Sequence, residues 1–220
     1  MPTLMRATPR GKSVPESRLR SNERVDTRSD AYAARLVARQ GVWWKRLLRV
    51  QAVYQWNLRR QQLGRTLDVG CGLGRNLVTL QPGSVGVDHN ATSVATARAA
   101  GLPACTVEEF RTGPDARPDA FDSLLLAHVV EHMTGEQARE LLAAYLPFLR
   151  PGGRVLFICP QEKGYASDET HVAWTDGEAL EQLARDTGLE PEPWRSFPLP
   201  RAAGRFFTYN EFLVAARKVG

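Results

Sequence analysis

The clearest candidate functional residues lie in one short glycine-rich stretch, Asp68-Val69-Gly70-Cys71-Gly72-Leu73-Gly74. An apolar run ends at Asp68 and a helical pattern begins at Asn76, which predicts a strand, a tight loop and a helix. Glycines at alternate positions let the backbone come unusually close to a bound group, and amides at a helix start can bind an anion. The stretch therefore predicts a site for a nucleotide-like ligand.

Two common nucleotide-binding patterns do not fit this loop. A dinucleotide fingerprint, G-x-G-x-x-G, would need a third glycine at position 75, where the chain has Arg75. The phosphate-binding pattern G-x-x-x-x-G-K-[ST] is absent as well. The remaining pattern is D-x-G-C-G-x-G. Taken alone, it leaves a purely structural strand-to-helix turn as the alternative to a ligand site.

Proton transfer is the second kind of chemistry that the sequence offers. Three of the four histidines, His128, His132 and His171, fall beside the predicted cleft. A histidine in such a place can act as a general base, which typically raises a rate about 10²–10⁴-fold. Helix-start packing is the alternative for Glu131 and His132. His171 closes a polar loop over residues 161–170 that can act as a lid.

Alternating short strands and helices must position these residues. The predicted helices are Asn76–Leu80, Ser93–Ala100, Glu136–Leu149 and one that opens with a capping box at Thr175 and stops at Gly188. This alternation implies parallel strands joined by crossover helices, and hence a doubly wound α/β sheet. The last two strands have no helix between them and are expected to form an antiparallel edge hairpin. The predicted strands are Thr66–Val69, Val85–Asp88, Cys105–Val107, Ser123–Ala127, Val155–Cys159, Glu192–Phe197 and Phe206–Ala216.

The first 65 residues differ from the rest in composition. They hold 15 of the 29 Lys and Arg residues but only 4 of the 24 Asp and Glu residues, a net charge of +11 against −6 for residues 66–220. Residues 1–28 are predicted to be a flexible basic segment. An apolar stripe at helical spacing predicts a helical cap over residues 29–65. Residues 66–220 form the predicted main domain.

The glycine-rich stretch resembles the first motif of class I S-adenosylmethionine-dependent methyltransferases. Four further segments match that family in the same order, and the likeness spans residues 66 to 216. It implies a mostly parallel, seven-stranded Rossmann-like sheet with an antiparallel edge hairpin, and S-adenosyl-L-methionine as cofactor. The four segments are Gly86–Asp88, Phe121–His132, Leu149–Leu156 and His171–Thr175.

The resemblance also implies which residues hold the cofactor. Asp88 would take the two ribose hydroxyls, and the glycine loop would meet the amino-acid end. Glu108 or Glu109 would bind the adenine amino group, while Phe110 and His89 would lie against the ring; an exposed loop position is the alternative for His89. The expected cofactor-binding residues are Asp68, Gly70, Cys71, Gly72, Asp88, His89, Glu108, Glu109, Phe110, Ala127 and His128.

The same likeness places the end of the fourth strand near the methyl group to be transferred. His128, His171 and Glu131 are therefore the expected catalytic residues. A backbone-only contribution to the cofactor pocket is the alternative for His128. Asp168, Glu169 and His171 carry oxygen and imidazole groups of the kind that bind Mg²⁺, but three residues of a polar loop do not define a site, and we predict no metal ligand.

The expected acceptor is a small polar molecule, and we favour a sugar hydroxyl because the cleft edge combines His, Asp, Glu, Tyr and Trp. The chain is similar in its whole make-up to actinobacterial saccharide O-methyltransferases, such as those of methylmannose polysaccharide synthesis. The alternative is an RNA methyltransferase that uses the basic arm, although its charges are spread and no base-flipping motif is present. We expect a cytoplasmic protein without a membrane span. A homodimer stays open.

Overall fold

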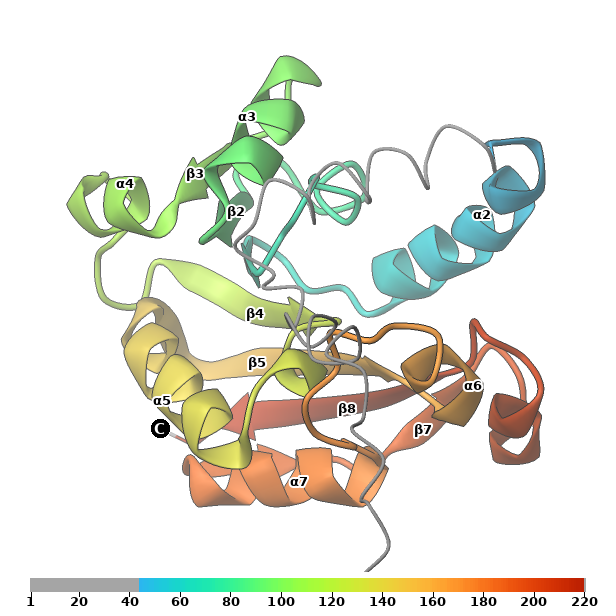
Figure 1. The fold of residues 1–220 in the computed structure, drawn as a ribbon. Coiled ribbons are helices and arrows are strands. Elements are labelled where there is room, and N and C mark those ends of the chain that lie inside the picture. Colours follow the sequence, from blue (N-terminus) through green and yellow to red (C-terminus); the bar gives the residue numbers. More distant parts are fainter. Residues whose placement is uncertain (1–43, 220) are drawn as a thin grey trace, which may run out of the picture.

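One eight-stranded sheet organises the part of the chain described by this computed structural model, residues 44–219 (Figure 1). The order is β3-β2-β1-β4-β5-β8-β6, with β7 also paired to β8. Strands β1 to β5 are parallel, whereas β8 runs antiparallel to β5, β6 and β7. The strands are β1 Thr66–Val69, β2 Val85–Asp88, β3 Ala104–Thr106, β4 Phe121–Ala127, β5 Leu149–Pro160, β6 Leu189–Pro191, β7 Arg195–Phe197 and β8 Glu211–Lys218.

Helices cover both faces of this sheet, as the doubly wound prediction requires (Figure 1). On one face, α4, α5 and α7 bury Phe110, Leu142 and Leu180 against alternate residues of the central strands. On the other face, Leu58 of α2 packs on the strand residues that point to that side, and α3 packs near the glycine loop. The helices are α2 Trp44–Arg60, α3 Ala91–Ala99, α4 Val107–Thr112, α5 Gly135–Tyr145, α6 Glu162–Tyr165 and α7 Gly177–Asp186, with 3₁₀ turns η2 Val130–His132, η3 Leu146–Phe148 and η4 Arg201–Arg205.

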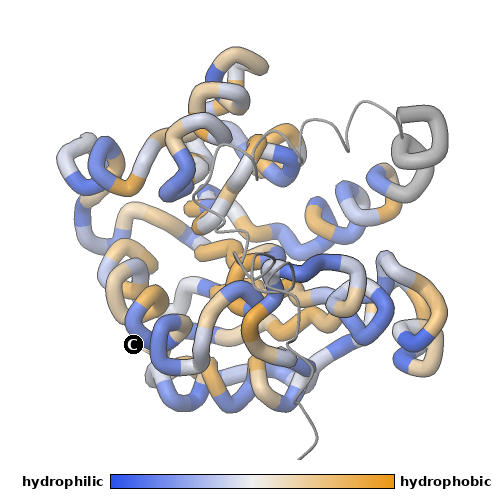
Figure 2. The backbone as a smooth tube through the Cα atoms, viewed as in Figure 1, coloured by the Kyte–Doolittle hydropathy of each residue, from blue (hydrophilic) through white to orange (hydrophobic). Residues whose placement is uncertain are grey.

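Successive side chains of a strand point to opposite faces of the sheet, and this alternation produces two apolar layers. In β4, Leu124 and Leu126 face the layer with α5 and α7, whereas Leu125 faces the layer with α2. All three are essentially unexposed. The central strands are therefore apolar on both faces, and Figure 2 shows hydrophobic stretches in the middle of the molecule. Polar residues at or directly after the carboxyl ends of these strands include Asp88, His128 and Gln161.

The helical cap and the basic segment are described only in part. Helix α2 lies within the predicted cap of residues 29–65, and its buried Leu58 packs on the sheet. The flexible segment predicted for residues 1–28 and the first part of the cap lie outside the described residues. Among the helices of residues 44–219, none combines the length and apolarity that crossing a membrane requires.

Several predicted boundaries need correction. The helix expected at Asn76–Leu80 is wrong: this segment forms successive turns, in which the amides of Thr79 and Leu80 bond the carbonyl of Asn76. The third strand ends at Thr106, because Thr106 and Glu109 form a capping box that starts α4 at Val107. The cap of α7 is Asp176 rather than Thr175, since the Asp176 carboxylate accepts from the Ala179 amide.

The edge of the sheet is also more divided than expected. The strand predicted as Glu192–Phe197 consists of two short strands, β6 and β7, and both pair with β8. Strand β8 begins only at Glu211, because the preceding residues form η4 and a turn. The antiparallel hairpin is thus present, and it brings Glu211 next to the end of β5, where Pro160 pairs with it.

Candidate functional site

The glycine loop lies at the carboxyl end of β1 and is held to β2 by backbone contacts. The amides of Gly70 and Cys71 both donate to the Val87 carbonyl, at 2.8 and 3.1 Å. The Gly72 amide donates to Asp88 Oδ2 at 2.7 Å, and the Asn90 amide donates to Asp88 Oδ1 at 2.8 Å. Asp88 therefore fixes the loop, and the predicted pairing of the two motifs is present.

Two of the loop glycines are required for different reasons. Gly70 has a φ of +75°, and a Cβ there would lie 2.6 Å from Cγ2 of Val129. Gly72 has a φ of +54°, but a Cβ there would meet no described atom within 4 Å. Gly70 thus allows the chain after β4 to approach, whereas Gly72 borders open space that a ligand can use.

Asp68 brings a buried carboxylate to the base of the loop. Its side chain is 1% exposed, and Oδ2 has no hydrogen-bond partner among the described residues. Burial, with the charge of Asp88, raises the pKa of Asp68 to about 7, against the opposing effects of an Asn76 hydrogen bond and Arg75. An unpaired buried carboxylate oxygen is costly, so this position suits a cationic ligand group.

The side chains of Cys71 and His89 lie beside the loop, and Cys71 contributes its amide to the contact with Val87. The Cys71 side chain is buried in a small cluster with Leu77 and Val94, and burial raises the pKa of its thiol well above the usual range. It is a core residue whose backbone belongs to the loop. His89 is half-exposed, with Nδ1 3.7 Å from Asp88 Oδ1.

Glu108 and Glu109, the two acidic residues after β3, have different surroundings. Both oxygens of Glu109 bind the Arg98 guanidinium, at 3.0 and 2.7 Å, and Oε2 also accepts from the Thr106 amide. These contacts argue against Glu109 as the adenine ligand and leave the exposed Glu108 as the candidate. Phe110 is 2% exposed, with Phe148 edge-on to its ring, which argues against the predicted ring wall.

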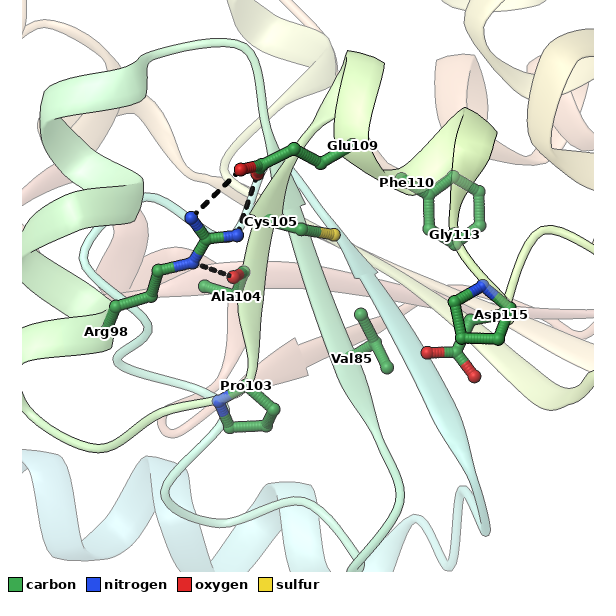
Figure 3. Close-up of a pocket in the computed structure, with 10 residues that line it drawn as sticks. Val85, Arg98, Pro103, Ala104, Cys105, Glu109, Phe110, Gly113 and Asp115 are labelled. Atoms are coloured by element: carbon green, nitrogen blue, oxygen red, sulfur yellow. Dashed lines mark hydrogen bonds and ion pairs between the residues drawn. The ribbon is translucent and has the colours of Figure 1, made fainter.

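A shallow pocket of about 360 Å³ lies beside β2 and β3 (Figure 3). It is lined by Val85, Pro103 and the Arg98–Glu109 ion pair, with Asp115 on its far side. Val85 begins β2, whereas Asp88 and the glycine loop lie at the other end of that strand. The pocket is therefore lined by Glu109 and Phe110 of the predicted cofactor residues but not by Asp68, the glycine loop or Asp88.

His128 occupies a special position directly after β4. Its φ is +59°, which is uncommon for a residue with a side chain, and its amide donates to the Ile158 carbonyl at 2.8 Å. The imidazole lies between two carboxylates. Nε2 is 2.9 Å from Oε1 of Glu211, and Nδ1 is 3.3 Å from Oε1 of Glu131. The side chain is 40% exposed, so a solute can reach it.

The electrostatics of this cluster favour a charged ring. Burial alone would lower the pKa of His128, but Glu131 and Glu211 outweigh it and raise the pKa to about 10. Glu131 is fully buried; desolvation opposes its ionisation, and the contacts with His128 more than compensate and lower its pKa. With both carboxylates ionised and the ring protonated, the cluster carries one net negative charge.

Glu211 and Tyr54 complete the cluster and were not found from the sequence. The buried side chain of Gln161 donates to the Glu211 carbonyl at 3.0 Å and accepts from Asn210 at 2.9 Å, which fixes the start of β8. The Tyr54 hydroxyl, on α2, donates to the Tyr209 carbonyl. Burial, and then the charge of Glu211, raise the pKa of Tyr54. These residues carry no motif, because their role arises only from long-range contacts.

His132 and His171 form a second group that shares Glu131. Their rings are 4.8 Å apart, and the ring of His171 also stacks on Tyr165. The amide of Val172 donates to the Glu131 carbonyl at 2.8 Å, which holds the predicted lid against η2. Burial, with the nearby His171, lowers the pKa of His132 despite the charge of Glu131. The predicted catalytic residues His128, Glu131 and His171 thus lie in one neighbourhood.

The two halves of the site meet through Val129. Its side chain fills the space above Gly70, and His128 precedes it in the chain. Ala127, the last residue of β4, pairs with Ile158 of β5. The glycine loop, Asp68 and Asp88 therefore lie on one side of the β4 end, and the histidine–carboxylate cluster lies on the other.

Comparison with known families agrees with this arrangement. Residues 67–155 match the sequence profile of a family described as a methyltransferase domain. The matched segment runs from β1 into β5 and includes the glycine loop, Asp88 and His128. Comparison with curated proteins gave no sequence match.

Solved structures share the fold at low sequence identity. A SAM-dependent methyltransferase from Archaeoglobus fulgidus is 19% identical over 76% of this chain and 94% of its own, with a TM-score of 0.59. A geranyl diphosphate methyltransferase in complex with SAM is 18% identical over 89% and 93%, with a TM-score of 0.58. A Thermotoga maritima protein, described as a possible histamine N-methyltransferase, is 16% identical over 84% and 97%, with a TM-score of 0.57.

Proposed function

We propose that this chain, an S-adenosylmethionine-dependent methyltransferase, transfers the methyl group of its cofactor to a hydroxyl group of a small polar acceptor, most specifically a saccharide. The observation that carries the proposal is the cluster of His128, Glu131 and Glu211, which is polar, net negative and open to solutes at the end of β4.

The residues around the glycine loop fit the cofactor. The unpaired Oδ2 of Asp68 suits the α-ammonium group, which would supply its missing partner. The open space beside Gly72 would admit the part of the cofactor that lies against the loop backbone. Asp88, already at the loop, is suited to the ribose hydroxyls because a carboxylate has about four lone-pair sites, of which the Gly72 and Asn90 amides use two. When bound, S-adenosylmethionine supplies an activated methyl group on a sulfonium.

The histidine–carboxylate cluster suits a hydroxyl acceptor. Methylation of an alcohol breaks its O–H bond, forms an O–CH₃ bond and releases one proton. Because the ring of His128 is already protonated, a carboxylate oxygen of Glu211 would take up that proton and pass it to water. Glu211 and Glu131 hold the ring of His128 in place, so the acceptor oxygen is aligned by a pre-formed group. Alignment can supply about 7–11 kcal/mol of barrier lowering.

The surroundings of the cluster favour a saccharide over an apolar acceptor. Trp174 is 41% exposed, and its ring lies edge-on to Tyr165 at 5.3 Å. A half-exposed aromatic ring beside carboxylates and imidazoles can stack on the C–H face of a sugar while the polar groups bind its hydroxyls. The amides of Val172 and Ala173 both bond the Glu131 carbonyl, so this aromatic segment is tied to the cluster.

The test is a transfer assay with methyl-labelled cofactor against four acceptor sets: mono- and oligosaccharides, tRNA, amines and carboxylic acids. We expect label in a saccharide, in a form that survives alkali, because a methyl ether is stable where a methyl ester is hydrolysed. The Asp88→Asn protein serves as the matched control and is expected to lose transfer to every set.

Transfer to tRNA, to an amine or to a carboxylate, without transfer to any saccharide, would contradict the proposed acceptor. Saccharide transfer that persists in the Asp88→Asn protein would show that the activity comes from a contaminant. Residues 1–43 of the basic arm that favours the RNA alternative lie outside the described residues, so the assay uses the full chain.

A further inference from the structure

We propose that Glu131, His132 and His171 bind a divalent transition-metal cation. One potential ligand atom from each residue lies within 4.8 Å of the other two. Bonds of about 2.1 Å would place ligand atoms roughly 3–4 Å apart, so side-chain rotation of about 1 Å completes the site. The proposal concerns cation binding and does not depend on the identity of the acceptor.

The hydrogen bonds of both rings leave the correct nitrogen for a cation. His171 Nδ1 lies 2.7 Å from the Tyr165 carbonyl oxygen, which can only accept, so Nδ1 carries the hydrogen. His132 Nδ1 lies 3.2 Å from the Thr170 carbonyl oxygen and therefore also donates. In the neutral ring, Nε2 of each histidine then holds the lone pair that a metal requires.

The contacts behind His132 form the kind of outer support that orients metal ligands. The Thr170 hydroxyl donates to Asp168 Oδ1 at 2.7 Å, which leaves its oxygen free to accept from His132 Nδ1 at 3.1 Å. Metal-binding histidines commonly donate their second nitrogen to a carbonyl or to a group held by a carboxylate. Asp168, one of the residues considered for Mg²⁺ from the sequence, thus supports His132 rather than facing the cluster.

Glu131 supplies an independent observation that points to a cation. The residue is fully buried, and its Oε1 has no hydrogen-bond partner in the described part of the chain. Its contact with His128 Nδ1 at 3.3 Å is an ion pair without hydrogen-bond geometry. A buried carboxylate oxygen with this ion pair but no hydrogen bond is incompletely compensated, and a bound cation would supply a further partner.

The donor set indicates the class of cation. Two imidazole nitrogens and one carboxylate oxygen suit Zn²⁺, Mn²⁺ or Fe²⁺, whereas Mg²⁺ and Ca²⁺ prefer oxygen ligands. Three protein ligands leave at least one position for water or an acceptor oxygen. The ion would also tie the segment after β5 to η2. This proposal replaces the sequence-based expectation of no metal ligand.

The test is a chelator competition with the full chain stripped of metal, with Zn²⁺ as the probe and without cofactor or acceptor. We expect one equivalent of Zn²⁺ in the unmodified protein and roughly 100-fold weaker binding in His171→Ala and in His132→Ala. His89→Ala, which removes a histidine from the end of β2, is the matched control and is expected to bind as the unmodified protein does. Millimolar Mg²⁺ should not displace the ion.

Equal Zn²⁺ affinity in the unmodified protein and the His171→Ala protein would overturn the proposal, as would loss of binding in His89→Ala alone. Co²⁺ added to the unmodified protein gives a readout that needs no variant. Visible absorption from nitrogen-coordinated Co²⁺, abolished by Zn²⁺, is expected, and its absence would also overturn the site. Because no methyl transfer is measured, this outcome is separate from the fate of the proposed acceptor.

Discussion

The two halves of the candidate site are built in different ways. The proposed cofactor half consists of the glycine loop with Asp68 and Asp88. In it, the Gly72 amide and the Asp88 carboxylate are 16 positions apart in the chain, and most contacts involve the backbone. The proposed acceptor half is the histidine–carboxylate cluster, in which His128 and Glu211 are 83 positions apart and Tyr54 bonds a carbonyl 155 positions away. The first half is local and made of main chain, and the second is distant and made of side chains.

This difference sets what each half tolerates. A backbone-built site depends on φ values and on space, so an added Cβ harms it even where no side chain is lost. A side-chain-built site depends on its charged groups, so an isosteric change that removes a charge harms it while the fold persists. The experiments below test this contrast between the two halves.

The largest effect is expected for His128→Asn. Asparagine tolerates a positive φ, so the backbone at +59° is kept while the imidazole between the two carboxylates is lost. Turnover should fall about 10³-fold, because the charged ring that aligns Glu211 and the acceptor is lost, while the affinity for S-adenosylhomocysteine changes by less than about threefold. Turnover is measured by release of S-adenosylhomocysteine, and affinity by calorimetry.

The matched control for His128→Asn is Asp119→Asn, an exposed site with a φ of +58°. Its turnover should equal that of the unmodified protein. Unchanged turnover in the His128→Asn protein would remove the imidazole from the mechanism and leave only its backbone in the site.

The next effect is expected for Asp88→Asn in the cofactor half. The carboxylate accepts from the Gly72 and Asn90 amides, and an amide nitrogen would face one of those donors. Loss of charge-assisted hydrogen bonds of about 1.5–3 kcal/mol should weaken S-adenosylhomocysteine binding about 100-fold. Calorimetry measures the change, with Asp186→Asn on α7 as control. A loss of turnover without a loss of affinity would contradict the assigned role.

The contrast also explains what could be predicted from the sequence. Strands β1 and β2 were predicted with their observed bounds, because Asp68 and Asp88 end apolar runs beside glycines of a known pattern. His128, Glu131 and His171 were singled out by residue type and position after strands. Glu211 could not be found, because it lay inside the predicted strand Phe206–Ala216, and only the pairing of β8 with β5 brings its carboxylate to His128.

The errors have physical causes of the same kind. Residues 76–80 have helical composition, but the loop that Asp88 holds turns the chain too tightly for a helix to begin there. Phe110, which was predicted to lie against the cofactor ring, is buried by its contacts with Phe121 and Tyr145, and its role beside a ligand stays a prediction. Local patterns predict the elements, and long-range packing decides which face a side chain takes.

Alanine variants of the loop glycines Gly70 and Gly72 distinguish an effect on stability from an effect on ligand binding. Gly70→Ala would bring a Cβ to 2.6 Å from Val129, and with a φ of +75° it should lower the free energy of unfolding by about 2–4 kcal/mol. Gly72→Ala meets open space, so it should cost only about 1 kcal/mol of stability. It should weaken S-adenosylhomocysteine binding about 30-fold, because the methyl group occupies the ligand's space.

Denaturant unfolding and calorimetry on both glycine variants check this pair. The expected pattern is a stability defect at Gly70 and a binding defect at Gly72. A Gly72→Ala protein that binds S-adenosylhomocysteine as tightly as the unmodified protein would mean that the open space beside Gly72 is not part of the cofactor site.

The smallest effect concerns the pH dependence that Asp68 should give to cofactor binding. Burial raises its pKa from 3.8 to about 7, so the carboxylate is mostly neutral at pH 6 and mostly ionised at pH 8. If Oδ2 receives the ammonium group, affinity should rise about tenfold from pH 6 to pH 8. In the Asp68→Asn protein, the affinity should be weak and nearly independent of pH over this range.

Stability should change in the opposite direction, which separates the two roles of Asp68. A carboxyl whose pKa is raised in the folded state stabilises the fold at low pH, and this stabilisation is lost as pH rises from about 4 through about 7. Between about pH 6 and pH 7, the free protein should therefore lose stability while its affinity for S-adenosylhomocysteine increases. Affinity that falls with stability would show that the ligand does not approach Asp68, and would place the cationic end of the cofactor elsewhere.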